Sequence, residues 1–350
     1  MNILLLGGSN AGMRDGWAAQ FAAKAGAHIV ENRFLGAVGS LYGLMALLKL
    51  ERERATPPDL VIFEYCLNDI LLLDADVLQP PLIVDALDAV ASFCARKRIA
   101  LLFLCLEPRP EPTKSRKAAG KVQPLYADAA ARGAIPCLWL REIFAGALAP
   151  AHFQDENHLT PDASARVADA VIAAINAGVV APGEPSEDPE AHFDYVDASQ
   201  ATMHGPCRLR HVSSKVFDGE FLEISRGGWS YWRGQGRLVG LMLQSTDRSG
   251  LYSIRSRDRM FWKNPRSQMQ DVVRNLMLLH YTTRRIAVDG EVEIGMPVDE
   301  LALTREPEDR TLLAAPSIAP FETQTLDIHG VIFWRPRRLL ARMRDFLRRS

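Results

Sequence analysis

The chain has 350 residues, of which 48% are hydrophobic and 24% charged, and its formal net charge at pH 7 is −1. This composition excludes a largely disordered or collagen-like chain. The longest apolar runs are too short for a transmembrane helix, and a net charge near zero predicts no nucleic-acid partner for the chain as a whole. One hydrophobic core rarely organises so many residues, so we expect two domains.

The first 180 residues alternate short apolar runs with amphipathic segments. The runs that we predict as strands are residues 3–6, 28–30, 60–65, 99–106 and 136–140. The helical patterns between and after them are residues 12–25, 41–54, 81–96, 122–132 and 161–176. Thr160 can cap the last helix, and Pro161 suits its first position. We therefore expect residues 1–180 to form an α/β domain, a flavodoxin-like doubly wound sheet of five parallel strands.

The pattern changes after residue 180. Residues 181–189 combine Pro, Gly and acidic residues without an apolar period, which predicts a linker. Beyond it, Asp218-Gly219 and Asp289-Gly290 each lie between short alternating runs, a pattern typical of β-hairpins. The elements that we predict here are hairpins at 212–224 and 285–294, strands at 238–243, 250–254 and 331–334, and a helix at 268–279. Residues 190–350 should therefore form a second, mostly antiparallel β domain, ending in an Arg-rich helix at 339–347.

The five cysteines include no Cys-x-x-Cys pair. Cys66, Cys105 and Cys137 lie in or beside predicted buried strands, so we expect reduced thiols in the core. The spacing of His204, Cys207 and His211 fits no common zinc site, and we expect no metal there. The first apolar run is four residues long and follows no basic segment, unlike a signal peptide. We therefore expect a cytoplasmic protein.

Residues 3–12 run from a strand through Gly7-Gly8 into a helix. Three interpretations fit this segment by itself. It can be a phosphate-binding loop of the dinucleotide type, with Glu31 binding a ribose hydroxyl. It can be a tight turn that presents Ser9 as a nucleophile, or a glycine turn without chemistry.

Three further segments favour the nucleophile. Gly39 offers a backbone N–H after the second strand, and Asn68 follows the third strand at its carboxyl end, where doubly wound folds bind their ligands. Asp155 precedes His158 by three residues just before the last helix. A carboxylate so placed can hold the second nitrogen of the imidazole and stabilise its protonated form, as a base that serves a serine requires.

Together these four blocks resemble the SGNH (GDSL-like) hydrolase family, over about residues 1–178. The resemblance implies that Ser9 is the nucleophile, His158 the general base and Asp155 the residue that orients it. It also implies an oxyanion hole made by the N–H groups of Ser9 and Gly39 and the side chain of Asn68. No cofactor or metal is implied.

The sequence departs from the family pattern at two positions. Gly8 stands where the family has the Asp of Gly-Asp-Ser, and Cys66 stands where it has a glycine two residues before the Asn. The first change leaves the nucleophile in place but alters how the turn is braced. The second change, Cys66 in place of glycine, is expected to narrow the substrate pocket.

The second half holds four of the six tryptophans. In the segment 229–232, a period of two places Trp229 and Tyr231 on one face of a strand and Trp232 on the other. Aromatic rings on strands suit stacking on sugar rings, which makes these three residues candidate substrate-binding residues, and they suit the core of a β domain equally. The basic C-terminal helix can contact an anionic membrane surface or pack on its own domain.

We therefore expect a serine esterase or deacylase that acts on short acyl esters, acetyl esters above all, of a carbohydrate. Its reaction passes through an acyl-enzyme on Ser9, and its partners are a small acyl ester or an acylated carbohydrate. One alternative is a polysaccharide O-acetyltransferase that uses the same residues. The others are a non-catalytic glycan-binding protein and a nucleotide-binding module.

Overall fold

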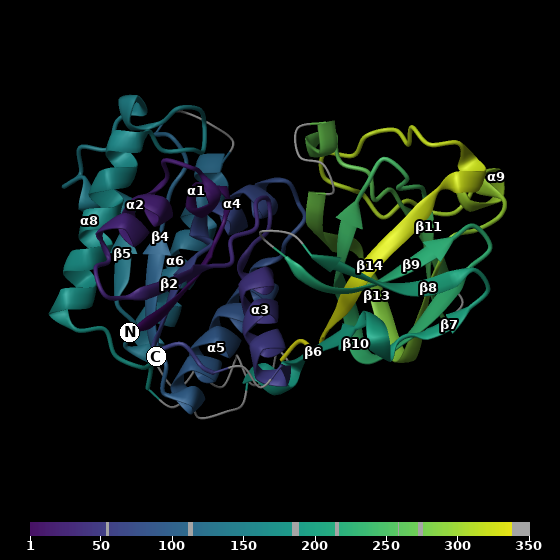
Figure 1. The fold of residues 1–350 in the computed structure, drawn as a ribbon, viewed down its shortest axis with the longest axis horizontal. Coiled ribbons are helices and arrows are strands. Elements are labelled where there is room, and N and C mark those ends of the chain that lie inside the picture. The colour runs from purple at the N-terminus through teal and green to yellow at the C-terminus, as the bar shows by residue number, and fades with distance from the viewer. Residues whose placement is uncertain are drawn as a thin grey trace. The chain divides into compact units, whose positions relative to one another are not determined.

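The computed structural model describes residues 1–53, 56–110, 115–183, 189–213, 217–257, 259–271 and 276–337. The chain divides into two compact units, Met1–Glu190 and Ala191–Ser350, each with its own hydrophobic core (Figure 1). Among these residues, no helix combines the length and the apolar character that crossing a membrane requires. The predicted helix at 339–347, and with it the expected membrane contact, lies outside the described residues.

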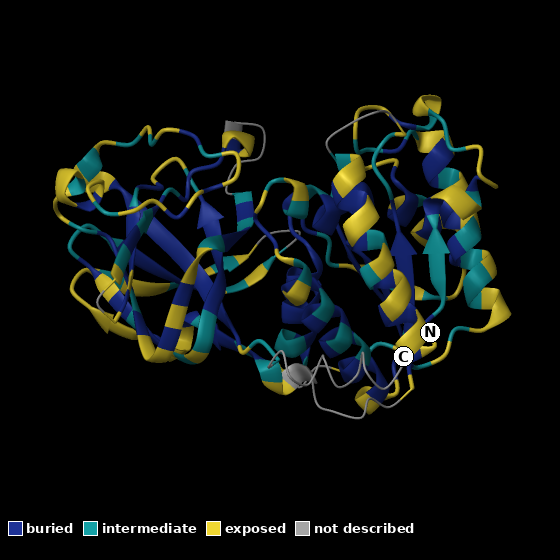
Figure 2. Ribbon diagram, turned by 180° about the vertical axis from the view of Figure 1, so that it is seen from behind, coloured by how far each residue is buried: buried dark blue, intermediate teal, exposed yellow. Residues whose placement is uncertain are grey.

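The first unit is built on a parallel sheet. Its five strands within the described residues lie in the order β2-β1-β3-β4-β5, and every neighbouring pair is parallel. The strands are β1 (Asn2–Gly7), β2 (Ile29–Asn32), β3 (Leu60–Glu64), β4 (Ala100–Cys105) and β5 (Cys137–Trp139). This is the flavodoxin-like order, so the predicted fold of this domain is confirmed. All five residues of β3 are buried, because helices cover both faces of the sheet (Figure 2).

Helices pack on the two faces of this sheet (Figure 1). The longer helices are α2 (Trp17–Lys24), α3 (Ser40–Arg52), α4 (Cys66–Asp74), α5 (Pro80–Lys97), α6 (Ser115–Gly133) and α8 (Pro161–Ala177), and the short ones are α1 (Ser9–Gly12) and α7 (Leu140–Ile143). One core contains Ile62 of β3 with Phe21 of α2 and Val171 of α8. On the other face, the ring of Phe103 of β4 meets that of Tyr126 of α6.

Two local details of the helices are informative. The hydroxyl of Thr160 accepts from the N–H of Ala163 at 3.3 Å, so the predicted cap of α8 is confirmed. The helix α4 was not predicted as a separate element, because its run of Ile, Leu, Leu and Leu has no polar positions that would reveal a helical period.

The second unit is an antiparallel sheet of nine strands within the described residues, again as predicted. The path β12-β11-β13-β10-β14-β9-β8 is extended by β6 on β14 and β7 on β10. The strands are β6 (Phe193–Asp197), β7 (Thr202–His204), β8 (Cys207–Ser213), β9 (Asp218–Ser225), β10 (Trp229–Ser245), β11 (Tyr252–Ser256), β12 (Arg259–Lys263), β13 (Leu276–Gly295) and β14 (Thr325–Trp334). A short helix, α9 (Glu300–Leu303), follows β13.

The hairpin turns were predicted in the wrong places. Asp289-Gly290 lies inside β13, which pairs with β10 from Ser245 back to Trp229, so the hairpin at 285–294 does not exist. The chain continues as a strand there because Asp289 and Gly290 pair with Gln235 and Gly234 of β10. Asp218-Gly219 begins β9, and Ser213 pairs with Asp218. The hairpin is therefore present as the antiparallel pair of β8 and β9, but Asp218-Gly219 belongs to β9.

The predicted helix at 268–279 is also wrong. A single 3₁₀ turn occupies Gln268–Asp271, and Leu276 already belongs to β13, where it pairs with Ser245. The apolar residues at the start of β13 fit a strand as well as a helix, and pairing with the end of β10 decides for the strand.

Candidate active site

Ser9 stands at the carboxyl end of β1, where the chain turns sharply into α1. Its Oγ lies 2.7 Å from Nε2 of His158, which is 149 residues away in the sequence. Nδ1 of the same ring lies 2.7 Å from Oδ2 of Asp155. With the proton on Nδ1 donated to the carboxylate, Nε2 is free to accept the hydroxyl proton of Ser9. The three predicted catalytic side chains are thus connected in the order Ser9, His158, Asp155.

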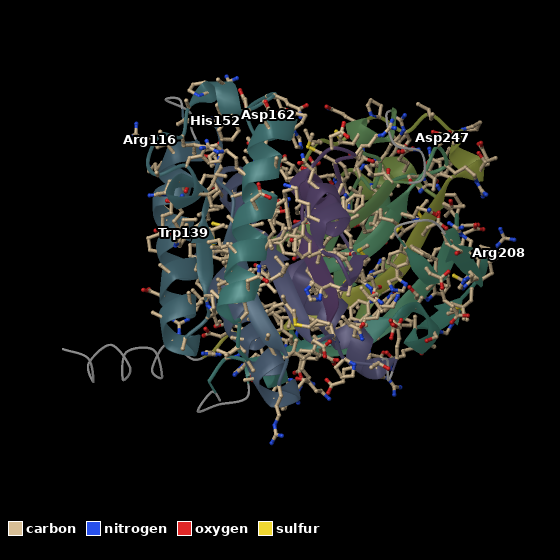
Figure 3. The ribbon with its side chains drawn as sticks, turned by 60° about the vertical axis from the view of Figure 1, so that its left-hand side comes forward. Arg116, Trp139, His152, Asp162, Arg208 and Asp247 are labelled. Carbon is tan, nitrogen blue, oxygen red and sulfur yellow. The ribbon has the colours of Figure 1, made fainter. Side chains whose placement is uncertain are left out.

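The segment that carries Asp155 and His158 is a tight turn closed by the backbone. The N–H of Thr160 donates to the carbonyl of His152 at 2.9 Å, and the N–H of Gln154 donates to that of His158 at 2.8 Å. Figure 3 labels His152 and Asp162, which flank this turn and lie at the same end of the first unit. The closed turn keeps the imidazole in place just before α8 begins.

The charge of Asp155 is stabilised within this turn. Its Oδ1 accepts the N–H groups of Asn157 and His158, each at 2.8 Å. Partial burial acts to raise the pKa of Asp155, but these N–H groups and the imidazole outweigh it, so the pKa lies below its ordinary value. The carboxylate is therefore ionised at neutral pH and can stabilise a protonated His158.

Asn10 joins α1, which carries Ser9, to the turn that carries His158. Its Nδ2 donates to the carbonyl of Asn157 at 2.9 Å, and its Oδ1 accepts the N–H of Leu159 at 3.0 Å. These two bonds flank His158 on either side, and the Asn10 side chain is buried. Sequence reasoning did not identify Asn10, because an Asn in a glycine turn carries no signal for a partner so far away.

Asn68, the predicted side-chain donor of the oxyanion hole, lies beside the nucleophile's turn. A Cβ placed on Gly8 would be 2.2 Å from Oδ1 of Asn68. Any side chain at position 8 would therefore displace the Asn68 amide. In this chain, glycine at position 8 makes room for the Asn68 amide.

Asp69 connects the Asn68 helix to the turn that contains Gly39. Gly39 directly precedes α3, and the N–H of Ser40 donates to Oδ1 of Asp69 at 2.9 Å. The hydroxyl of Tyr126, on α6, donates to Oδ2 at 2.8 Å. Burial raises the pKa of Asp69 to about 6, against the effect of these two donors. Asp69 therefore positions two of the three predicted oxyanion donors relative to each other.

Glu64, the last residue of β3, lies behind the glycine turn and is completely buried. Its Oε2 accepts the N–H of Gly8 at 3.1 Å. Burial raises the pKa of Glu64 to about 8, although the Gly8 N–H partly opposes this. A glutamate within an apolar run gave no sequence signal for this role. Position 8 has no carboxylate of its own, and the carboxyl group of Glu64 stabilises the turn through its hydrogen bond with the Gly8 N–H.

The segment after β2 runs alongside the nucleophile. The N–H of Arg33 donates to the carbonyl of Leu5 at 2.9 Å, and that of Leu35 donates to Gly7 at 3.0 Å. A Cβ on Gly36 would lie 3.6 Å from the Cβ of Ser9, so this segment forms a wall close to the serine.

The dinucleotide-binding interpretation does not fit this site. The Gly8 N–H, which a phosphate would need, donates to the carboxyl group of Glu64. Glu31, the expected ribose ligand, forms a surface ion pair with Arg33 at 2.5 Å. The turn is therefore filled by the protein's own side chains.

The three aromatic candidates of the second unit do not share one environment. Trp232 is completely buried, and its indole N–H donates to Oγ of Ser230 at 2.8 Å. Its assignment to substrate binding was therefore wrong: the strand's alternation directs it into the core. Trp229 is 39% exposed and stacks against His204 with ring centroids 5.7 Å apart. Tyr231 is half-buried and donates to Glu293 at 3.0 Å.

Comparisons with known proteins find likeness in structure alone. No protein-family model and no curated protein matches the chain. A solved structure described as a two-domain esterase (CEX) active on acetylated mannans is similar, with a TM-score of 0.61 and 13% identity over 96% of this chain and 92% of that one. The structure of this esterase co-crystallized with mannopentaose gives a TM-score of 0.58 and 12% identity, over 96% and 91% of the two chains. The chain therefore shares its two-domain fold with this solved structure, and its first domain has the flavodoxin-like strand order that the sequence predicted.

Proposed function

We propose that this protein is a serine esterase that removes short acyl groups, acetyl above all, from a carbohydrate. The observation that carries the proposal is the pair of 2.7 Å contacts that link Ser9, His158 and Asp155. The fold likeness to an esterase active on acetylated mannans extends over 96% of the chain and so includes the second domain, which supports a carbohydrate ester as the substrate.

In the proposed reaction, Oγ of Ser9 attacks the ester carbonyl while its proton moves to Nε2 of His158. The carbonyl oxygen becomes negatively charged and is stabilised by the N–H groups of Ser9 and Gly39 and the amide of Asn68. As the tetrahedral intermediate collapses, His158 returns the proton to the leaving sugar hydroxyl, and the acyl group stays on Ser9. His158 then takes a proton from water as the water oxygen attacks the acyl carbonyl. When this second tetrahedral intermediate collapses, His158 gives that proton to Oγ of Ser9, which releases the acid and restores the enzyme.

The first experiment replaces these three residues and measures hydrolysis of an aryl acetate. Ser9→Ala and His158→Ala should each lower kcat by about 10⁴-fold or more, since each removes a group that takes part in bond making. Asp155→Asn should lose less than His158→Ala, because the turn still holds the ring. A Ser9→Ala variant as active as the wild type would rule the proposal out.

Labelling provides an independent check. A fluorophosphonate should modify the native protein on Ser9, located by mass mapping of its peptides, and should leave the His158→Ala variant largely unlabelled. An adduct on a different serine would place the reactive site elsewhere.

A further inference from the structure

A pocket of about 360 Å³ lies in the second unit, among residues that the catalytic proposal does not use. This volume falls within the range of small-molecule sites, about 300–1,000 Å³. The residues that line it come from the start of β10, from β11 and β12, from the end of β13 and from α9. They include Trp229, Ser253, Arg255, Met260, Glu293 and Gly295.

The register of the sheet explains why a hollow forms here. Trp229, Gly295 and Ser253 stand side by side on β10, β13 and β11. Gly295 and Ser253 have small side chains and lie next to Trp229 across the sheet. They therefore leave a hollow beside the indole ring. A Cβ on Gly295 would lie 2.9 Å from the Cβ of Trp229, so a larger residue there would crowd the indole.

The next row of the same face supplies polar groups. Tyr231, Glu293 and Arg255 are neighbours across the same three strands. The Tyr231 hydroxyl donates to Oε2 of Glu293 at 3.0 Å, and Nε of Arg255 lies 3.5 Å from Oε1. Because the second distance is long for a hydrogen bond, Oε1 keeps capacity to accept. A carboxylate acceptor and guanidinium donors therefore stand together at the edge of the pocket.

This combination matches the chemistry of a sugar ring. The exposed indole of Trp229, held in place by its stacking on His204, offers a flat apolar surface for the C–H groups of a pyranose. Glu293 accepts from ring hydroxyls and Arg255 donates to them, and each hydroxyl can do both. The charged lining residues are Arg255, Glu293 and Asp299, so an anionic sugar would meet more negative than positive charge.

We propose that this pocket binds a neutral pyranose unit of an oligosaccharide, with Trp229 as the stacking platform and Glu293 and Arg255 as the hydroxyl ligands. The inference rests on the proposed function for the idea that a carbohydrate is the substrate. The pocket itself contains none of the catalytic residues, so binding here does not require Ser9.

The test is calorimetric titration of the full chain with unacetylated mannopentaose, which the catalytic site cannot hydrolyse. The wild type should bind it saturably, and Trp229→Ala should weaken the affinity by about tenfold or more. Glu293→Gln keeps the shape of the side chain and should weaken the affinity about tenfold. Circular dichroism shows whether each variant folds. If Trp229→Ala does not fold, Glu293→Gln still tests the proposal.

The chain offers a matched control. Arg257 and Asp289 form a second Arg–carboxylate pair between the β11–β12 connection and β13, at 3.3 Å, and neither residue lines the pocket. Asp289→Asn should therefore bind mannopentaose as the wild type does. Trigalacturonate, which carries carboxylates, should bind at least tenfold more weakly than mannopentaose.

Three outcomes would overturn the proposal: no saturable binding of mannopentaose, unchanged affinity in both Trp229→Ala and Glu293→Gln, or equal affinity for trigalacturonate. Fluorophosphonate labelling of Ser9 separates this proposal from the catalytic one. A labelled Ser9 without oligosaccharide binding defeats the pocket alone, whereas binding without a reactive Ser9 defeats the esterase alone.

Discussion

Glu64 and Gly8 together explain how the turn that carries Ser9 is supported. Gly8 has no side chain, so it leaves space for Asn68, and its N–H donates to the buried carboxyl group of Glu64 at 3.1 Å. A carboxyl group in this position is more stable protonated than ionised, because burial raises its pKa to about 8. The support of the turn is therefore linked to pH.

The free energy of unfolding should reflect this pKa. Between about pH 4.5 and 8, Glu64 releases its proton in the unfolded chain but keeps it in the folded one. The folded state then binds more protons, so stability falls as the pH rises through this window and is constant with respect to Glu64 above it. Glu64→Gln should remove this dependence on pH. In the wild type, the loss in the free energy of unfolding that Glu64 causes should reach a few kcal/mol at about pH 8.

Urea unfolding of both forms at intervals from pH 5 to pH 9 measures the effect. Asp69, with a pKa raised to about 6, adds a similar slope at lower pH in both forms and cancels in the difference. If the stability curves of wild type and Glu64→Gln run parallel over the whole range, Glu64 titrates as an ordinary carboxyl group.

Asn68 provides a second prediction for a single residue. If its amide donates to the developing oxyanion, Asn68→Ala should lower kcat on an aryl acetate by about 10²–10³-fold with a smaller change in KM. Asn176, an exposed amide in the last turn of α8, is the control, and Asn176→Ala should be as active as the wild type. A loss that falls mainly on KM would assign Asn68 to substrate binding instead.

At the scale of elements, the site depends on how α1 is joined to the turn before α8. Each part is short: α1 spans four residues, and the turn from His152 to Thr160 contains a single backbone bridge, Phe153 with Leu159. Neither by itself fixes where its side chain lies relative to that of the other. The two hydrogen bonds of Asn10 link them and set the distance between Ser9 and His158.

Asn10→Ala should therefore lower kcat/KM by about 10–100-fold, since a displacement of about 1 Å in a catalytic group has an effect of this order. Thr160→Ala is the matched control, because it removes the cap of α8 next to the same turn but leaves both Asn10 bonds in place. It should cost about 1 kcal/mol of stability and little activity.

The comparison of the two variants, by aryl acetate kinetics and thermal unfolding, separates positioning from stability. Asn10 acts as inferred if its variant loses far more activity than the Thr160 variant at a similar loss of stability. Equal losses of activity would mean that stability alone is responsible.

For the molecule as a whole, the reaction proposed here takes place in the first domain, and the surroundings of Ser9 bear on the acyl group that it accepts. The segment after β2 lies close to Ser9: a Cβ placed on Gly36 would be 3.6 Å from the Cβ of Ser9. The ring of Phe34 occupies the space that a side chain on Gly12 would fill. We expect an acyl chain longer than two carbons to meet this wall.

We expect kcat/KM to fall from acetyl to butyryl to octanoyl aryl esters, by at least about tenfold overall, because each added methylene must find space beside this segment. Steady-state kinetics with the three esters measures this directly. Octanoyl hydrolysis as fast as acetyl hydrolysis would show that the acyl chain leaves Ser9 in another direction.

Much of this architecture could be predicted from the sequence. The apolar strands and the helices between them are local, periodic patterns, and in a doubly wound sheet they bring the carboxyl ends of β1 and β3 together. Ser9, Asn68 and the Asp155–His158 pair were therefore identifiable, because each follows a recognisable element. The cap at Thr160 was predictable for the same reason, since donor and acceptor are three residues apart.

Other features were decided only by the tertiary structure. The carboxyl group of Glu64 binds a residue 56 positions away, and Asn10 binds a turn nearly 150 positions away, so no local pattern reveals either. Asp289-Gly290 looks like a turn, yet the neighbouring β10 keeps it extended. The pocket beside Trp229 depends on which residues stand opposite one another on three strands. Sequence alone determines patterns within an element, whereas the fold decides which elements, and thus which side chains, become neighbours.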